Sequence, residues 1–341
     1  MTEDGNVELT SYEILTADDP AGILKVLISL GVCQSDETTT GVSKAGEGNM
    51  NLVLRVKTDH QSLIVKQARP WVEKYPGIPA SDERILSEIE FYRSISGFSD
   101  VRAAMPSVLA SAPQQRVMVM EDLGAASDYS SLYQANTDDA EVNSVFQQAI
   151  DWVTRLHEVD LNEEHDIGCA GLLELNHKHI FSVPLNAPPE IDLDQVCSGL
   201  TKASRSLCAD DSVKSEMERL GKIYLKGGGS LLHGDYYPGS WLKTEPGFRV
   251  IDPEFCFCGP REYDLGVLAA HWIFCGGEAN DTTIDRVSNS STQISRPLIF
   301  GFAGAELIRR LIGVGQLPLD ADLSRRVQWL ECGVRFLRKS A

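Results

Sequence analysis

The sequence lacks an excess of positive charge and has no long apolar run. Its 341 residues contain 31 Lys and Arg against 49 Asp and Glu, a formal net charge of −18. Nucleic acids and anionic membranes attract basic surfaces, so this balance argues against either as a partner. The best apolar run, Leu265 to Phe274, contains His271 and is far shorter than the roughly 18 residues that a membrane-spanning helix needs.

A targeting signal and paired cysteine motifs are also missing. Met1 to Gly5 has neither the basic residues nor the apolar core of a secretory signal, so a cytoplasmic location is the expectation. The eight cysteines are scattered, without the C-x-x-C spacing of structural zinc or thiol redox sites. Cys256 and Cys258 would share one face of a strand, where packing explains them better than metal binding.

What is present is an ordered series of elements. Strands are predicted, from alternating apolar residues, at residues 38–44, 51–57, 61–67, 108–109 and 116–120. Helices are predicted, from apolar residues three and four apart, at residues 20–30, 81–95, 142–156, 263–274, 296–313 and 323–338. We therefore expect an α+β fold of two lobes, an antiparallel lobe at 1–121 and a mainly helical lobe at 122–341. Short β-like runs near 240–243 and 248–251 interrupt the second lobe.

Two acidic motifs in the second lobe carry the clearest chemical signal. His233-Gly-Asp235 and Asp252-Pro-Glu254 each follow a short β-like run. Asp and Gly are common in turns, which is the plain reading of either motif alone. Phosphoryl transfer, however, needs one carboxylate beside the attacking hydroxyl and others to hold Mg²⁺, and the two motifs together supply both.

A lysine in the first lobe fits the same chemistry. Alternation along residues 62–67 places Lys66 on the face opposite Leu63 and Val65. A surface lysine on an edge strand is the simple alternative. In a kinase such a lysine contacts the α- and β-phosphates and is held by a helix glutamate, for which Glu88 is a better candidate than Glu83 or Glu90.

The order of these features resembles that of the protein-kinase-like small-molecule phosphotransferases, which include aminoglycoside phosphotransferases and choline kinases. Within this superfamily the chain is most similar to the methylthioribose kinases. The similar segments are Gly46-Glu-Gly-Asn-Met-Asn51, Leu63-Ile-Val-Lys-Gln-Ala68, His233-Gly-Asp-Tyr-Tyr-Pro-Gly-Ser240, Val250-Ile-Asp-Pro-Glu-Phe255 and the twin-arginine helix Phe302 to Gly313. Tyr236-Tyr-Pro238 departs from the Leu-His-Thr usual between the catalytic Asp and Gly-Ser, and residues 185–212 match no known segment.

The resemblance implies ATP as the phosphate donor and a nucleotide site in the first lobe. Gly46, Gly48 and Asn49 would form a loop over the phosphates, although two glycines in a hairpin also suit a plain turn. Lys66 would contact the phosphates and Glu88 would hold it. Backbone groups around Glu121 to Leu123 would meet the adenine.

The second lobe is implied to hold the metal and the acceptor. Asp235 would be the catalytic base or hydroxyl-orienting group, and Asp252 and Glu254 would bind Mg²⁺. Arg309 and Arg310 would contact the acceptor sugar, whereas without the resemblance they would be read as a solvated helix face. The implied reaction is transfer of the γ-phosphoryl group to 5-methylthioribose, giving its 1-phosphate. A homodimer is also implied by the resemblance.

Two other functions stay open on the sequence. The first is a phosphotransferase for another small hydroxylated acceptor, such as an aminoglycoside, an amino alcohol or a different sugar. The acidic composition would suit a cationic acceptor, but two arginines in the acceptor pocket would repel ammonium groups. The second is a non-catalytic nucleotide-binding regulator, against which the intact Lys66, Asp235, Asp252 and Glu254 argue.

Overall fold

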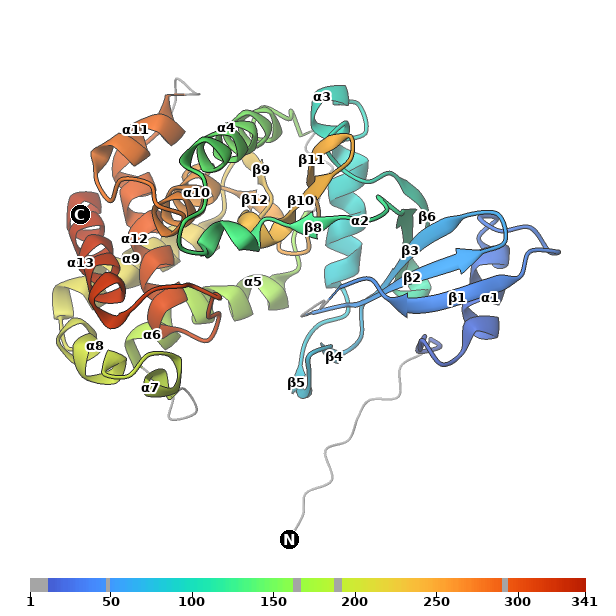
Figure 1. The fold of residues 1–341 in the computed structure, drawn as a ribbon, viewed down its shortest axis with the longest axis horizontal. Helices are drawn as coiled ribbons and strands as arrows, with labels where there is room; N and C mark the ends of the chain where they lie inside the picture. Colours follow the sequence, from blue (N-terminus) through green and yellow to red (C-terminus); the bar gives the residue numbers. More distant parts are fainter. Residues whose placement is uncertain (1–11, 47–49, 162–166, 187–191, 290–293) are drawn as a thin grey trace, which may run out of the picture. The chain divides into compact units, whose positions relative to one another are not determined.

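The computed structural model describes residues 12–46, 50–161, 167–186, 192–289 and 294–341. The chain divides into two compact units (Figure 1). The first comprises Met1–Tyr92 with Pro106–Gly124, and the second Arg93–Met105 with Ala125–Ala341. The segment 93–105 thus groups with the C-terminal part of the chain, and the sequence-based boundary after residue 121 stays a prediction.

The first unit is built on a five-stranded antiparallel sheet. Its strands lie in the order β1-β2-β3-β7-β6. They span β1 Thr39–Lys44, β2 Leu52–Thr58, β3 Ser62–Gln67, β7 Val117–Glu121 and β6 Val108–Ala112. All five strands were predicted within a few residues. In β2 and the first half of β3, buried residues alternate with less buried ones, as a strand with one face on the core requires.

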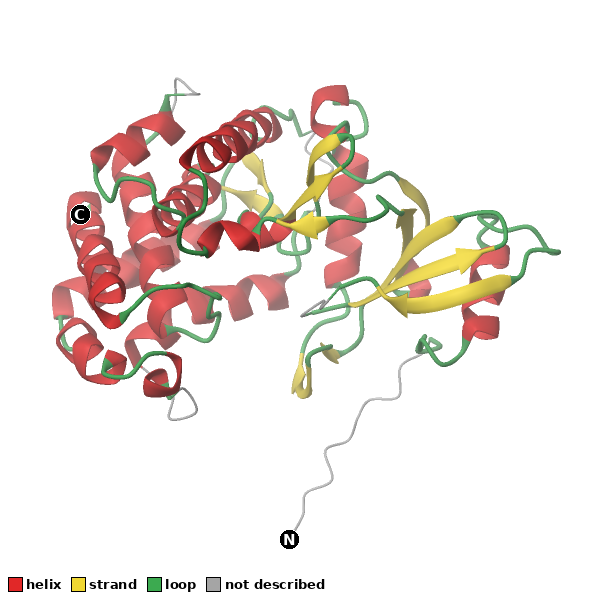
Figure 2. Ribbon diagram, in the orientation of Figure 1, coloured by secondary structure: helices red, strands yellow, loops and turns green. Residues whose placement is uncertain are grey.

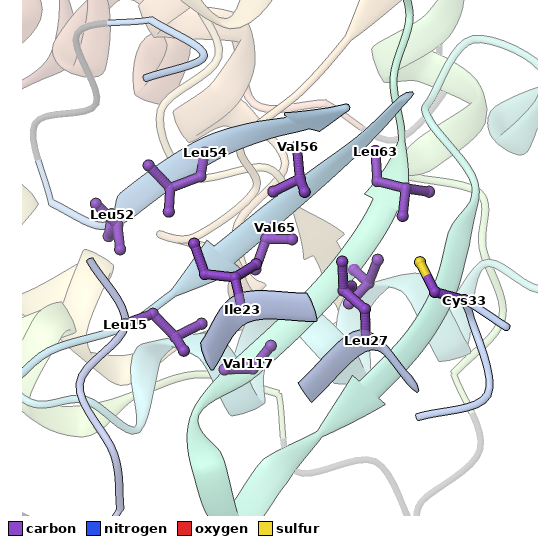
Figure 3. Packing of buried hydrophobic residues seen from close by; sticks show 11 residues of the cluster. Leu15, Ile23, Leu27, Cys33, Leu52, Leu54, Val56, Leu63, Val65 and Val117 are labelled. Carbon is purple, nitrogen blue, oxygen red and sulfur yellow. The ribbon is translucent and has the colours of Figure 1, made fainter. Parts of the chain in front are cut away.

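Helices cover both faces of this sheet. Helix α1 (Pro20–Ser29) begins at Asp19, whose side chain accepts a hydrogen bond from the Gly22 backbone N–H at 2.9 Å. Its Ile23 and Leu27 pack on Leu54, Val56 and Val65 in the cluster that Figure 3 shows. Helix α2 (Arg84–Ser94) packs on the other face, where its apolar residues meet those of β3 and β7 (Ile64, Ile85, Ile89, Met118 and Met120).

The second unit is mainly helical (Figure 2). Its longer helices are α4 Asp139–Leu156, α5 Ala170–His177, α8 Leu200–Cys208, α9 Asp211–Lys226, α10 Glu262–Phe274, α11 Asp281–Ser288, α12 Arg296–Ile312 and α13 Leu323–Ser340. Every residue of α10 is buried, and it packs on α12, which packs in turn on α13. The predicted α+β arrangement of an antiparallel sheet followed by a helical region is confirmed.

Small β elements support the loops that carry the two acidic motifs. β9 (Ser230–Leu232) leads into His233 and pairs with β12 (Phe257–Gly259). β10 (Trp241–Thr244) pairs with β11 (Gly247–Val250), which leads toward Asp252, and with the short β8 (Ser127–Asp128). The two strands that precede the motifs therefore belong to different sheets.

Several elements were not predicted. They are the hairpin β4 (Trp71–Val72) and β5 (Tyr75–Pro79), the short helices α3 (Ser99–Arg102), α6 (Val183–Asn186) and α7 (Leu193–Val196), and helices α5, α8, α9 and α11. Residues 178–182 form a π-helical turn between α5 and α6. The segment 185–212, which matched no known segment, thus contains α7, α8 and the beginning of α9.

Within the part of the chain that the structure describes, no helix has the length and apolar character needed to cross a membrane. All eight cysteines carry free thiols, and five of them are buried. The predicted free thiols are confirmed, and packing accounts for most of them.

Candidate functional site

Lys66 and Glu88 form a buried ion pair in the first unit. The Lys66 Nζ lies 2.9 Å from Glu88 Oε1 and 2.7 Å from Oε2, and the two residues are 2% and 0% exposed. β3 presents Lys66 on the face that α2 covers, which brings it to Glu88, the glutamate preferred from the sequence. An ion pair without solvent is costly to form, so its presence calls for a reason other than stability.

The end of β7 holds the segment expected to meet adenine. Glu121 is tied to the neighbouring strand region, since its Oε2 accepts from the Ser107 N–H at 3.0 Å. Asp122 accepts from Arg55 Nε at 2.9 Å and from the Ser62 hydroxyl at 2.5 Å. Burial alone would raise the pKa of Asp122, but these bonds lower it below its ordinary value. Arg55 and Asp122 thus fix the conformation of the segment that ends in Leu123, a role that the sequence did not indicate.

The glycine-bearing hairpin is only partly described. Gly46 has a φ of +138°, a conformation that favours glycine. Gly48 and Asn49 lie outside the described residues. Where the chain resumes, the fully buried Arg84 of α2 donates from Nε to Asn51 Oδ1 at 2.8 Å and from Nη2 to the Met50 carbonyl at 2.7 Å. Arg84 therefore anchors the C-terminal end of this hairpin.

In the second unit, the loop with the His-Gly-Asp motif requires its glycine. Gly234 has a φ of +85°, and a Cβ on it would lie 1.9 Å from the carbonyl oxygen of Phe255. No side chain fits at that distance, so the glycine allows the loop to approach the segment that follows Asp252. His233 donates from Nε2 to the Ile251 carbonyl at 2.9 Å and connects the same two loops.

Asp264 of α10 fixes the backbone of the motif. Its carboxylate accepts from the N–H groups of His233, at 2.8 Å, and Gly234, at 3.1 Å, and from His157 Nε2 at 3.1 Å. Asp264 is fully buried, and burial also lowers the pKa of His233 so that its imidazole stays neutral near pH 7. Neither Asp264 nor His157 was singled out from the sequence.

Both arginines of α12 reach Asp235. Arg310 Nη2 lies 3.0 Å and Arg309 Nη2 3.3 Å from the same oxygen, Asp235 Oδ1. Among the described residues, the other oxygen, Oδ2, accepts no hydrogen bond, while the Asp235 side chain is 25% exposed. The two guanidinium groups are nearly buried rather than on a solvated face, so the plain reading of this pair is wrong.

Glu306 forms hydrogen bonds with both arginines. Its carboxylate accepts from Arg310 Nε at 2.7 Å and from Arg309 Nε, and it is 1% exposed. Burial alone would raise the pKa of Glu306, but the two guanidinium charges hold it well below its ordinary value. The spacing of these three residues along one helix face was visible in the sequence and is the signal that would have identified Glu306.

Asp252 and Glu254 lie in the loop that His233 contacts. Asp252 is exposed and Glu254 is partly buried. The backbone of Asp252 has a φ of +59°, an uncommon conformation for a residue with a side chain, and such strain gathers at functional sites. Carboxylate oxygens are the ligands that Mg²⁺ prefers, so the pair suits that ion. No group of three metal-binding side chains occurs among residues whose placement is described.

Tyr237 belongs to the segment Tyr236-Tyr-Pro238, which the sequence analysis singled out as unusual. Its ring lies 4.6 Å from the Arg310 guanidinium carbon and 5.1 Å from the centre of the His271 ring. The neighbouring Tyr236 is fully buried and donates to the Ala149 carbonyl at 2.9 Å. Tyr236 is therefore a core residue, while the partly exposed Tyr237 belongs to the group around Asp235.

Comparison with known proteins finds sequence similarity to phosphotransferases. The sequence pattern of the phosphotransferase enzyme family matches residues 41–286. The methylthioribose kinase of Exiguobacterium sibiricum is 26% identical over 383 aligned positions, covering 96% of this chain and 91% of that protein. The methylthioribose kinase of Bacillus pumilus is 26% identical over 377 positions, covering 93% and 90%.

Solved structures agree on the fold. The crystal structure of LicA in complex with AMP has a TM-score of 0.53 at 14% identity, and it covers 94% of this chain and 98% of that chain. The crystal structure of choline kinase LicA from Streptococcus pneumoniae has a TM-score of 0.50 at 13% identity, with 93% and 98% covered. At these identities the likeness establishes a shared fold.

Proposed function

The chain belongs to the phosphotransferase enzyme family, and on that premise we propose that it transfers the γ-phosphoryl group of ATP to a hydroxyl of 5-methylthioribose. The product would be the 1-phosphate of the sugar. The resemblance read from the sequence motifs is confirmed, and the chain is a small-molecule kinase with a hydroxyl acceptor. The identity of the acceptor rests on relatives that carry the name methylthioribose kinase.

The environment of Asp235 is the observation that carries this proposal. With Oδ1 held by both arginines, Oδ2 is left to accept a hydrogen bond from the acceptor hydroxyl. That hydrogen bond would orient the hydroxyl oxygen for attack on the γ-phosphorus. As the new P–O bond forms, the bond between the γ-phosphorus and the β–γ bridging oxygen would break, ADP would leave, and the Asp235 carboxylate would receive the hydroxyl proton. Positioning is most of what a protein contributes to phosphoryl transfer.

The nucleotide and metal would be held by the remaining residues. Asp252 and Glu254 would bind Mg²⁺, which supplies charge neutralisation between the β- and γ-phosphates. Lys66, kept in place by Glu88, would bind the phosphates from the first unit. The backbone at Glu121 to Leu123 would bind adenine, and Gly46 with Gly48 and Asn49 would cover the phosphates.

A neutral sugar suits the acceptor side better than a cation. Arg309 and Arg310 bring two positive charges, which the carboxylates of Glu306 and Asp235 balance. The ammonium group of a cationic acceptor would be repelled by the two guanidinium groups, which already form ion pairs with the Asp235 carboxylate. We therefore rank aminoglycosides and amino alcohols behind sugars.

An acceptor panel tests the proposal. The purified protein is incubated with ATP and Mg²⁺ and with 5-methylthioribose, ribose, choline or an aminoglycoside, and phosphorylated products are identified by mass spectrometry. The proposal expects the sugar 1-phosphate from methylthioribose at the highest kcat/KM. Efficient phosphorylation of choline or the aminoglycoside would reassign the acceptor, and Mg²⁺-dependent ATP binding with no product would favour the non-catalytic regulator.

A further inference from the structure

Two buried residues outside the motifs extend the group around Asp235. His271 of α10 lies 2.9 Å from Glu306, between Nε2 and Oε1. On its other side, His271 Nδ1 lies 2.6 Å from the hydroxyl of Tyr133. Tyr133 belongs to a short 3₁₀ turn, Ser130–Tyr133, far from α10 in the sequence. The contacts form one continuous chain from Tyr133 through His271, Glu306 and the arginines to Asp235.

The hydrogen-bond partners determine the form of the imidazole. A carboxylate can only accept, so Nε2 carries the proton that goes to Glu306, and Nδ1 accepts from the tyrosine hydroxyl. Burial lowers the pKa of His271 to about 4, which leaves the ring neutral at pH 7. The ring thus donates to Glu306 without adding a third positive charge beside Arg309 and Arg310.

We propose that Tyr133 and His271 are positioning residues, which orient the Glu306 carboxylate and through it hold both arginines on Asp235. The terminal torsion of a glutamate is broad, so its carboxylate plane is set by its hydrogen bonds. Here the orientation of the Glu306 carboxylate plane fixes the positions of Arg309 Nε and Arg310 Nε. The Nη2 atoms of the same two arginines are then placed to contact Asp235 Oδ1. Tyr133 contributes by donating to His271 Nδ1, which keeps His271 in the tautomer that donates from Nε2 to Glu306. Residues bonded to metal-binding histidines fix the tautomer of those histidines in the same way.

The energetic cost of the chain supports a positioning role. Tyr133, His271 and Glu306 are 3%, 0% and 1% exposed. Apolar residues at such places are often as stabilising as a buried ionic group, so stability alone does not explain them. What the chain does provide is a fixed direction for two long side chains that otherwise have several free torsions.

Two variants of His271 separate positioning from packing. His271→Leu removes the donor to Glu306, whereas His271→Gln keeps an amide N–H near the place of Nε2. We expect His271→Leu to lower kcat for the acceptor reaction by about 10- to 100-fold, the range for outer-shell partners of a functional group. His271→Gln should recover most of that loss, and KM for ATP should change less than twofold in both variants.

Tyrosine variants supply a matched control. Tyr133→Phe removes the hydroxyl that fixes the tautomer and should lower kcat by roughly 3- to 10-fold. Tyr224→Phe removes an equally buried hydroxyl, which is bonded to Asn176 Nδ2 at 3.1 Å outside the chain of contacts. It should have a similar effect on thermal stability and leave kcat unchanged.

A second readout does not depend on the acceptor. This inference rests on the proposed function only for its kinetics, because the hydrogen bonds themselves can be followed by ¹⁵N NMR of the arginine side chains. Arg309→Lys and Arg310→Lys assign the two Nε–H signals. We expect slow hydrogen exchange for both in the wild type and in His271→Gln, and fast exchange in His271→Leu.

The outcomes are distinguishable. If Nε–H exchange responds as expected but the wild type phosphorylates no acceptor, the proposed function fails and the positioning chain stands. If His271→Leu matches the wild type in both exchange and kcat, the positioning role is overturned. The same holds if His271→Leu and His271→Gln lose equal activity, since a loss that the retained donor does not rescue reflects packing alone.

Discussion

The two oxygens of the Asp235 carboxylate have different surroundings. Oδ1 meets both arginines, and the described residues provide no hydrogen bond to Oδ2. Because the arginines fix Oδ1, the orientation of the carboxylate is set, and Oδ2 is the oxygen that can accept the proton of one hydroxyl. The motif was visible in the sequence, but its asymmetry was not, because it depends on Glu306 and on side chains from other parts of the chain.

Lys66 offers a test at the residue scale. Lys66→Met breaks the buried ion pair with Glu88, and the loss of one member of such a pair costs about 3–5 kcal/mol of unfolding free energy. The double variant Lys66→Met/Glu88→Leu should recover stability, since apolar pairs replace buried ion pairs well. Both variants should lose roughly 10²-fold or more in kcat/KM for ATP, as when other electrostatic donors are removed.

Urea unfolding and steady-state kinetics on the same preparations provide the measurement. Lys57→Met, at an exposed position on the neighbouring strand β2, is the control and should match the wild type. Retained ATP kinetics in the double variant would show that the pair has only a structural role.

At the scale of single elements, α12 shows what the sequence can and cannot reveal. Its helical pattern predicted the span to within one residue, and the helix carries Glu306, Arg309 and Arg310 on neighbouring turns. Glu306 contacts His271, which is 35 positions away along the chain, and His271 in turn contacts Tyr133, which is 138 positions from it. Nothing in a single sequence encodes such pairings directly, which is why this part of the site was missed.

The predicted and missed elements differ in their patterns. α4 has eight buried residues along one stripe and was predicted at once. α8 buries only Leu200, Ser204 and Leu207, so its polar sequence did not stand out as a helix. Likewise β12 has three residues and is held by pairing with β9 rather than by local preference. Short elements that depend on distant partners cannot be read from periodicity.

The loop at Gly234 supports a prediction about stability. Gly234→Ala forces a side chain into a left-handed conformation and onto the Phe255 carbonyl oxygen. Gly31→Ala is the matched control, because Gly31 has a similar φ of +71° but nothing within 4 Å of the added Cβ. We expect a loss of about 1 kcal/mol for Gly31→Ala, the cost of the conformation alone. Gly234→Ala should cost about 3 kcal/mol or more, through added strain.

Chemical denaturation of both variants measures this difference. Equal losses would show that the loop moves away from Phe255 with little cost, and that the close approach does not constrain the motif.

For the whole molecule, the pH dependence of stability follows from its buried histidines. Burial lowers the pKa of His271 to about 4 and also lowers that of His233, whereas histidine in an unfolded chain titrates near about 6.5. The unfolded state therefore binds more protons as the pH falls below that value, and stability is lost from about pH 6.5 toward pH 4. Above about pH 6.5 the contribution is complete. The low pKa of Glu306 acts in a separate window, with loss only below about pH 4.5.

Urea unfolding between pH 4.5 and 7.5 measures this dependence. Each such histidine contributes a slope of up to about 1.4 kcal/mol per pH unit. His271→Gln should flatten the profile by the share of one histidine, while His60→Gln, at an exposed histidine, should leave it unchanged. Stability that rises as the pH falls through this range would contradict the buried neutral state of His271.

The net charge of −18 bears on how the whole molecule binds an anionic nucleotide. An acidic protein that binds ATP must concentrate positive charge locally, and the buried Lys66, Arg309 and Arg310 are such places. Each of these three side chains forms an ion pair with a carboxylate, which fixes the location of its positive charge. The division of work between a nucleotide-binding part and an acceptor-binding part stays a prediction.

The most direct test of the central proposal is the turnover of Asp235→Asn, followed by ³¹P NMR with ATP, Mg²⁺ and 5-methylthioribose. The wild type should produce a sugar phosphate signal, and the variant should produce it about 10²- to 10⁴-fold more slowly, the usual contribution of a positioned acid or base. The same product at the wild-type rate from Asp235→Asn would contradict the proposed role of Asp235.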